Sequence, residues 1–437
     1  MAQSRTALLF SGQGQLDPQF TDQLGAAPSA AHILEEAQAA WVREGEDPSL
    51  LSLGEGIAAV GTGDDSFQAV VTVAQVRLFL TGVLAFDLLR YRGTRADVLI
   101  GHSLGEIAAL CAAGALSVGD ATRAVILRTR ALFAYHKDGH GLLALSAGEE
   151  RARMLQQLAG AEQTALACLN SPQDVVLSGP DAELAEVARI AGQWDVSSIR
   201  LNAPFAFHHP ANDAAASVLR ETLKGLTAKP VGTPVYSPIA EAWIEEGKDL
   251  ADLLATHLVC PVRFADAVRH VHDRGVGRFI ECGSGDVLVK IVSRTVSGAE
   301  VLAPLHGPSR RPADTCTEQT SAATEPGLTS PHTPSTATEP PADTERDAHD
   351  LGAATTQGAN LEDEVRELYA TSLGYPVEVF EDDAELEADL GIDSLKRTEL
   401  LAKVAQHYRI PLNTTKAATL YTIADVIVDV RSQLESK

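Results

Sequence analysis

Two kinds of apolar pattern alternate along residues 1–306. Short apolar runs bounded by turn residues, Thr6–Phe10 and Asp97–Gly101, are typical of buried parallel strands, whereas Val70–Leu89 is long, free of Pro and apolar at helical spacing. Two further short runs around Asn170–Gly179 predict a hairpin inside a smaller inserted unit. This alternation of strands and helices predicts an α/β domain built on a parallel sheet.

The last 77 residues have a different pattern, in which apolar positions recur at helical spacing over three segments. The segment carries 16 acidic and 8 basic residues, so its net charge is −8. We predict a small acidic helical bundle of four helices. The apolar positions that we expect in its core are Leu361, Val365, Leu368, Tyr369, Leu400, Leu401, Val404, Tyr408, Ile423, Val426, Ile427 and Val430.

Residues 307–360 differ from both of these parts. They contain seven Pro and eleven Thr but only two large apolar residues, Leu328 and Leu351. Such a stretch cannot bury enough surface to offset its ordering entropy, so we predict a disordered tether. A flexible chain of this length spans ~40 Å root-mean-square. The predicted organisation is a large domain over 1–306, a tether over 307–360 and a module over 361–437.

The charge and the cysteines narrow the class of protein. With 59 acidic and 35 basic residues the formal net charge is −24, which argues against nucleic acid and against an anionic membrane as partners. We recognise no signal peptide and no membrane-spanning run, and we expect a reducing, cytoplasmic location. We expect neither a disulfide framework nor a metal site, because five cysteines lie far apart: Cys111, Cys168, Cys260, Cys282 and Cys316.

One pentapeptide carries a sharp chemical signal. Gly101–Gly105 reads GHSLG, follows a predicted strand and opens an Ala-rich helix, which is the context of a nucleophile elbow rather than of a chance Gly-Ser turn. Ser103 would be the nucleophile, and the backbone N–H of Leu104 would face a developing oxyanion. A serine nucleophile needs a base, but the chain holds thirteen histidines and spacing alone does not choose among them.

Several motifs together carry a resemblance to a known family. The large domain resembles the malonyl-CoA:acyl-carrier-protein transacylases and the acyltransferase domains of polyketide and fatty-acid synthases. Its motifs occur along the chain in the same order as in that family. The resemblance implies an α/β-hydrolase-like core with a ferredoxin-like insert over residues 139–206. The motifs are FSGQG (Phe10–Gly14), GHSLGE (Gly101–Glu106), LRTRAL (Leu127–Leu132), FAFHHP (Phe205–Pro210), PVRFADAV (Pro261–Val268) and ECGSGDVL (Glu281–Leu288).

The resemblance also assigns roles to single residues. It makes Ser103 the nucleophile and His208 the base, and it places oxyanion-hole N–H groups at Leu104 and Gln13. His209 sits where Ser is common in the family, so it is not assigned as the base. His257, four residues before Pro261, falls where the family orients its base through a backbone carbonyl. The substrate pocket would further involve Gln75, Asn170, Phe207 and His257.

Arg128 bears on the choice of substrate. It lies 25 positions after Ser103, in the place where dicarboxylate-using members keep an Arg. A guanidinium can hold a malonyl carboxylate through two parallel hydrogen bonds. The sequence FAFH ending at His208 also resembles the HAFH motif of malonyl-specific members more than the YASH motif of methylmalonyl-specific ones. Ser11 stands where the family usually has Pro, a departure that touches the oxyanion loop.

The C-terminal module has a motif of its own. Asp389–Leu395 reads DLGIDSL and resembles the attachment motif of acyl carrier proteins. The resemblance implies that Ser394 receives 4′-phosphopantetheine at the start of a helix, rather than acting only as a helix cap.

Together these motifs predict an acyltransferase fused to an acyl carrier protein. It would move a malonyl or similar dicarboxylic acyl group from its acyl-CoA to the phosphopantetheine thiol of its own carrier, in polyketide or fatty-acid biosynthesis. A ketosynthase and a phosphopantetheinyl transferase would be partners. Three alternatives stay open: an editing hydrolase, a loader of other carrier proteins in trans, and a docking subunit with an inactive transferase.

Overall fold

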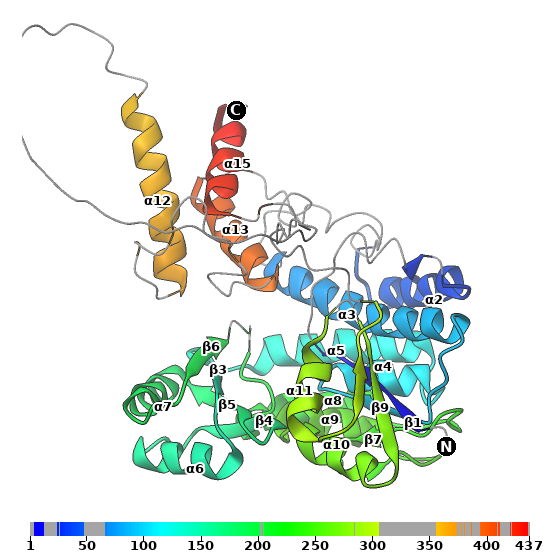
Figure 1. Cartoon of the computed structure of the whole chain (residues 1–437). Coiled ribbons are helices and arrows are strands. Elements are labelled where there is room, and N and C mark those ends of the chain that lie inside the picture. The colour runs from blue at the N-terminus through cyan, green and yellow to red at the C-terminus, as the bar shows by residue number, and fades with distance from the viewer. Residues whose placement is uncertain are drawn as a thin grey trace, which may run out of the picture.

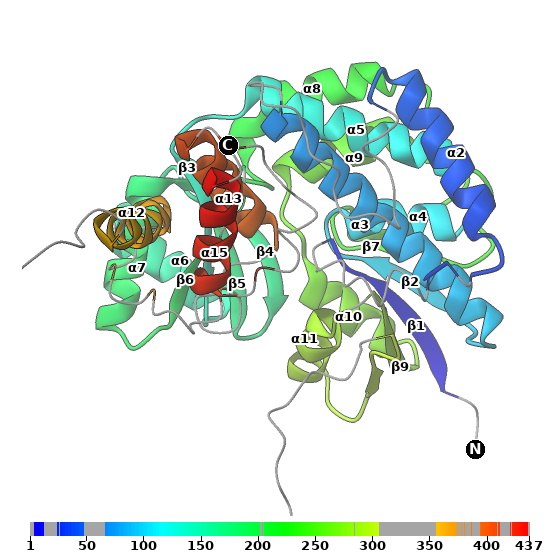
Figure 2. The ribbon, with the colours of Figure 1, turned by 90° about the horizontal axis from the view of Figure 1, so that it is seen from above.

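The computed structural model describes residues 4–12, 24–25, 27–47, 66–201, 203, 205–283, 285–305, 355–373, 377, 380, 386, 394–408, 410, 420 and 422–435. Figures 1 and 2 show an α/β domain with helices of the C-terminal module beside it. The main elements of the large domain are β1 (Arg5–Phe10), α2 (Ala30–Arg43), α3 (Ser66–Tyr91), β2 (Val98–Gly101), α4 (Gly105–Ala112), α5 (Val118–Tyr135), α8 (Asp213–Thr222), α9 (Leu250–Val259), α10 (Phe264–His272), β9 (Val276–Cys282), α11 (Val287–Thr295) and β10 (Glu300–Leu302).

The central sheet has four parallel strands in the order β10-β9-β1-β2. Successive side chains of a strand point to opposite faces. In β1, Leu8 and Phe10 therefore join the core under α3 and α4, whereas Ala7 and Leu9 join the core under α10 and α11. The predicted strands at the positions of β1 and β2 are confirmed, and helices cover both faces, as their unbroken apolar runs require.

Helix α3 confirms the predicted long apolar helix, and it begins and ends slightly beyond Val70–Leu89. In the part of the chain that the structure describes, its segment Gln68–Tyr91 is the one long and apolar enough to cross a membrane. However, 83% of its most apolar window is buried inside the protein. It packs against α4 and α5, so its apolar surface is used within this domain.

A second, antiparallel sheet forms the inserted unit, with strands in the order β4-β5-β3-β6. Helices α6 and α7 cover one face, and residues of the other face share a core with α10 and α11. The strand and helix order is βαββαβ, as expected for a ferredoxin-like unit. Its elements are β3 (His140–Leu145), α6 (Glu149–Leu158), β4 (Ala165–Ser171), β5 (Asp174–Pro180), α7 (Asp181–Gln193) and β6 (Ser198–Leu201); β4 and β5 are the predicted hairpin.

The described part of the C-terminal module contains three helices, α12 (Thr355–Leu373), α13 (Ser394–Tyr408) and α15 (Ile423–Glu435). Nine of the twelve apolar positions predicted for its core are buried in one hydrophobic cluster, and Leu361, Leu368 and Tyr408 pack against it partly buried. Helix α12 begins at Thr355, so six residues that the sequence assigns to the tether are helical. The last proline of the tether is Pro341, so no proline ring prevents the helix from beginning before Leu361. Residues 307–354 of the predicted tether lie outside the described residues.

Candidate active site

Ser103 lies on a tight turn between β2 and α4. Its backbone is left-handed, with φ +53°, which strains a residue that has a Cβ atom. The glycines on either side are required by close approach of the backbone. A Cβ at Gly101 would clash with the backbone of Glu106, and one at Gly105 would clash with the carbonyl of Phe10. The turn therefore packs tightly against β1 and holds the serine at the edge of the sheet.

The Ser103 hydroxyl meets His208. Its Oγ lies 2.8 Å from His208 Nε2, although the two residues are 105 positions apart in the chain. On the other side of the ring, Nδ1 lies 3.0 Å from the carbonyl oxygen of Cys260. Because a carbonyl only accepts, Nδ1 carries the proton and Nε2 is free to accept from the serine. The hydrogen bonds therefore fix the tautomer that a general base needs.

The carbonyl that orients His208 corrects one expectation. It belongs to Cys260 and not to His257, where the resemblance placed it. His257 lies inside α9, whereas Cys260 follows the helix with an extended backbone (φ −99°, ψ 147°). A carbonyl in this extended conformation does not point along the helix axis, so it can turn toward the His208 ring.

Burial controls the charge of His208. The side chain is 2% exposed, and this desolvation holds its pKa well below its usual range near 6.5. The positive charge of Arg128 lowers this pKa further, while the hydrogen bond to Cys260 raises it. The imidazole is therefore neutral at neutral pH and can accept a proton.

Of the two expected oxyanion donors, the structure describes only Leu104, which lies next to the serine. Leu104 directly precedes α4, and its N–H has no acceptor among the residues that the structure describes. The loop after β1 approaches it closely, because a Cβ at Gly12 would lie 3.0 Å from the Leu104 nitrogen. Gln13 lies outside the described residues.

Arg128 is buried in α5 beside two of the other predicted pocket residues. It is 2% exposed. Its Nη1 donates to Gln75 Oε1 at 3.3 Å, and its Cζ lies 5.2 Å from the centre of the Phe207 ring. Burial lowers the pKa of Arg128 to about 10, so it stays charged at neutral pH. Its Nε, also buried, has no hydrogen-bond partner among the described residues, which leaves a donor for an anionic group.

His209 has a different environment from its neighbour His208. Its Nε2 donates to the carbonyl of Gln163 at 2.8 Å, and its Nδ1 accepts the N–H of Ala211 at 3.0 Å. Nε2 thus fastens the loop to the inserted unit, and Nδ1 caps the short helical turn at Pro210–Asn212. This arrangement explains why His209 is not available as the base.

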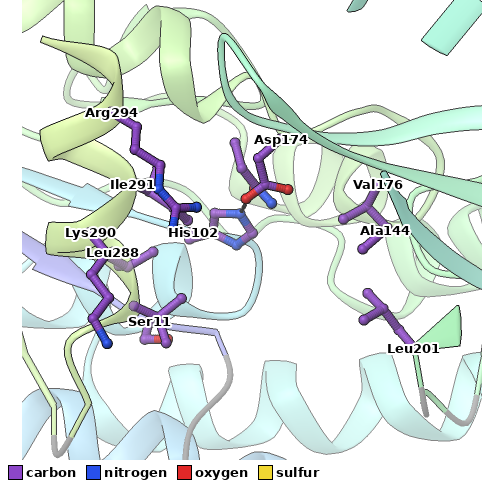
Figure 3. A pocket seen from close by; sticks show the side chains of 12 residues that line it. Ser11, His102, Ala144, Asp174, Val176, Leu201, Leu288, Lys290, Ile291 and Arg294 are labelled. Atoms are coloured by element: carbon purple, nitrogen blue, oxygen red, sulfur yellow. Dashed lines mark hydrogen bonds between the residues drawn. The ribbon is translucent and has the colours of Figure 1, made fainter. Parts of the chain in front are cut away.

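A cavity of about 290 Å³ opens between α11 and the antiparallel sheet, beside the serine turn. Figure 3 shows His102 near its centre, with Asp174 close by and with Lys290 and Arg294 on α11. The predicted pocket residue Asn170 lines it and accepts a hydrogen bond from His102 Nε2 at 2.8 Å. The wall opposite α11 is apolar: Ala144, Val176 and Leu201.

No sequence pattern assigns a role to His102, Asp174, Lys290 or Arg294. Only the spacing of four between Lys290 and Arg294, which places them on one face of a helix, could have suggested a common role. Nothing local places that face next to the hairpin of the inserted unit.

Ser394 is the first residue of α13, as the attachment motif predicts for a serine at a helix start. Residues 387–393, which hold most of that motif, lie outside the described residues. The backbone N–H groups at a helix start favour a phosphate group, so this position fits a phosphopantetheine attachment.

Comparison with known proteins places this geometry in a family. Residues 13–323 match the acyl transferase domain family, and residues 363–427 match the phosphopantetheine attachment site family. Malonyl CoA-acyl carrier protein transacylase of Bacillus subtilis is 31% identical over 300 residues, covering 67% of this chain and 90% of that protein. Polyketide synthase GfsA of Streptomyces halstedii is 32% identical over 312 residues; the match covers 70% of this chain and only 4% of the synthase.

A solved acyltransferase domain is also similar to this chain in structure. The acyltransferase domain from module 8 of the salinomycin polyketide synthase is 30% identical, with a TM-score of 0.61, over 68% of this chain and 70% of that one. The chain therefore belongs to the family of malonyl-CoA:acyl-carrier-protein transacylases and polyketide-synthase acyltransferases. It is an acyltransferase followed by a phosphopantetheine attachment domain.

Proposed function

We propose that this chain transfers a malonyl or similar dicarboxylic acyl group from CoA, through an ester on Ser103, to the phosphopantetheine thiol carried on Ser394 of the same chain. The observation that carries the proposal is the 2.8 Å contact between Ser103 Oγ and the neutral, correctly oriented His208. The buried Arg128 supports the choice of a dicarboxylic substrate.

The first half-reaction follows from this geometry. His208 Nε2 takes the hydroxyl proton as Ser103 Oγ attacks the thioester carbonyl of the acyl-CoA. The oxyanion is held by the Leu104 N–H, with Gln13 as the second donor that the family resemblance implies. The carbon–sulfur bond then breaks, and the imidazolium returns its proton to the CoA thiolate. Arg128 pairs with the free carboxylate of the acyl group, so this negative charge stays neutralised while the acyl group is bound to Ser103.

In the second half-reaction the same groups work in reverse. The phosphopantetheine group, when attached to Ser394, supplies a thiol as acyl acceptor. His208 Nε2 accepts the thiol proton and passes it to Ser103 Oγ as the ester bond breaks. Leu104 again faces the oxyanion. After this step Ser103 and His208 have returned to their starting protonation states.

Loading within one chain has two supports. A tethered carrier reaches a local concentration of roughly millimolar, far above typical protein concentrations in an assay. Helix α13, whose first residue is Ser394, also contacts α3 of the transferase, as Figure 1 illustrates.

A mixing experiment tests this proposal. Phosphopantetheinylated full chain carrying Ser103→Ala is mixed with full chain carrying Ser394→Ala, and malonyl-CoA is added. We expect slow, concentration-dependent loading of the mixture and fast, concentration-independent loading of the unmodified chain. Equal rates would show loading in trans. Steady release of free malonate by the unmodified chain, without protein-bound acyl group, would show a hydrolase.

A further inference from the structure

Glu106 and His257 are buried ionisable groups that the proposed reaction does not use. Both side chains are 0% exposed, and Glu106 Oε2 lies 3.7 Å from His257 Nε2. Neither carboxylate oxygen of Glu106 and neither ring nitrogen of His257 has a hydrogen-bond partner among the residues that the structure describes. Polar groups buried in this way normally have partners, so their placement in contact with each other needs an explanation.

The two residues lie on two helices that end next to the reacting groups: α4 begins after Ser103, and the end of α9 contacts the loop of His208. Glu106 is the second residue of α4 and follows Ser103 by three positions. His257 is in the last turn of α9. A contraction of about 0.8–1 Å would turn the 3.7 Å contact into a charge-assisted hydrogen bond. The pair therefore joins α4 to α9.

The end of α9 in turn holds the loop that carries the base. The carbonyl of Leu258 accepts hydrogen bonds from the N–H of His209 and from the Asn212 side chain, at 3.0 and 3.1 Å. The carbonyl of Cys260 accepts from His208 Nδ1. The position of His208 thus depends on where α9 ends, and the position of Ser103 depends on where α4 begins.

We propose that Glu106 and His257 form a positioning pair that sets the distance between Ser103 Oγ and His208 Nε2 by fixing α4 against the end of α9. This role rests on the proposed function of Ser103 and His208. A displacement of about 1 Å between reacting groups can lower a rate about 100-fold, so a rigid connection at this place matters for catalysis.

The test uses Glu106→Gln, His257→Gln and the double variant of the full chain. We expect each single variant to lower the rate of Ser103 acylation by malonyl-CoA at least tenfold and to change the KM less than twofold. The double variant should lose no more than the slower single variant, because the two residues act as one unit.

The matched control is Thr122→Val, which removes the hydrogen bond that a fully buried side chain donates to the carbonyl of Val118 at 2.8 Å. It should lower the melting temperature without changing the acylation rate. If the pair variants lower the melting temperature but not the rate, or if their effects on the rate multiply, the positioning role is wrong. His257→Asn serves in the same comparison if His257→Gln does not fold.

A second reagent separates this inference from the proposed function. A small fluorophosphonate reacts with an activated serine and needs no acyl-CoA site. If the unmodified chain accepts no malonyl group, the proposed function fails. The pair is then still judged by fluorophosphonate labelling of Ser103, which should slow at least tenfold in Glu106→Gln; an unchanged rate overturns the pair.

Discussion

Ser103 and His208 meet at 2.8 Å with both backbones in the left-handed region, at φ +53° and +56°. Residues with a Cβ atom rarely adopt this conformation, and it costs about 1–3 kcal/mol at each position. The surrounding structure therefore has to hold both residues in place. The tightly packed glycines hold the serine turn, and the end of α9 holds the histidine loop.

Arg128 should select for a free carboxylate on the acyl group. Its buried guanidinium contacts Gln75 and Phe207, and its Nε has no hydrogen-bond partner among the described residues. We expect Arg128→Ala to lower kcat/KM for malonyl-CoA about 100-fold or more, because a buried charge-assisted pair is lost. The same variant should gain activity toward acetyl-CoA. Competition between the two donors measures the ratio, and an unchanged preference for malonyl-CoA would contradict this role.

The pH dependence should reflect the lowered pKa of His208. The base works in its neutral form, so activity is lost only as the pH falls through the pKa of the folded protein. Because burial and Arg128 hold that pKa well below 6.5, kcat/KM for acylation should stay flat from pH 8 down past 6.5. In Arg128→Ala, measured with acetyl-CoA, the acid limb should begin at a higher pH. A limb centred at or above 6.5 in the unmodified chain would show that His208 is not so perturbed.

The same shift has a consequence for stability. The unfolded chain binds the proton of His208 more tightly than the folded chain does, since the folded pKa is the lower one. The contribution of this group to stability is therefore present above about pH 6.5 and decreases as the pH falls below it. Urea unfolding of Ser103→Ala with and without His208→Gln checks this. The two proteins should differ in the slope of stability against pH only below about 6.5.

Lys290 and Arg294 should bind the phosphate part of the donor. They lie on one face of α11 at the cavity beside the serine turn (Figure 3). Lys290 pairs with Asp286 at 2.8 Å, and the charge of Arg294 opposes the rise that burial causes in the pKa of Asp174. Arg294→Ala should raise the KM for malonyl-CoA about tenfold, as expected for a charge-assisted hydrogen bond. It should leave malonyl-pantetheine, which has no phosphate, unaffected.

A control variant is Arg189→Ala, which removes an exposed arginine paired with Glu186 on the far helix α7. It should change neither KM. If Arg294→Ala affects malonyl-CoA and malonyl-pantetheine equally, the residue does not recognise phosphate.

The sequence predicted the strands and core helices well because their apolar runs are local. It could not choose His208 among thirteen histidines, since the contact with Ser103 joins segments 105 residues apart; the family resemblance supplied that choice. The error at His257 has a local cause. Which carbonyl faces the base depends on how the backbone leaves α9 at Cys260, and that conformation has no signal in the residue pattern.

The cavity residues were missed for a different reason. Asp174 comes from a hairpin of the inserted unit, and Arg294 comes from a helix of the large domain. Their proximity results from packing between two units and not from spacing within either one. In the C-terminal module, by contrast, the helical spacing predicted the core residues correctly, because each helix buries one continuous face.

Intact-mass measurement of the phosphopantetheinylated full chain after incubation with malonyl-CoA tests the central claim most directly. We expect the unmodified chain to gain malonyl groups on the transferase and on the carrier, and Ser394→Ala to gain one on the transferase alone. Ser103→Ala should gain none at either position when no other transferase is present. Malonylation of Ser103→Ala at the unmodified rate would contradict the claim that the acyl group passes through Ser103.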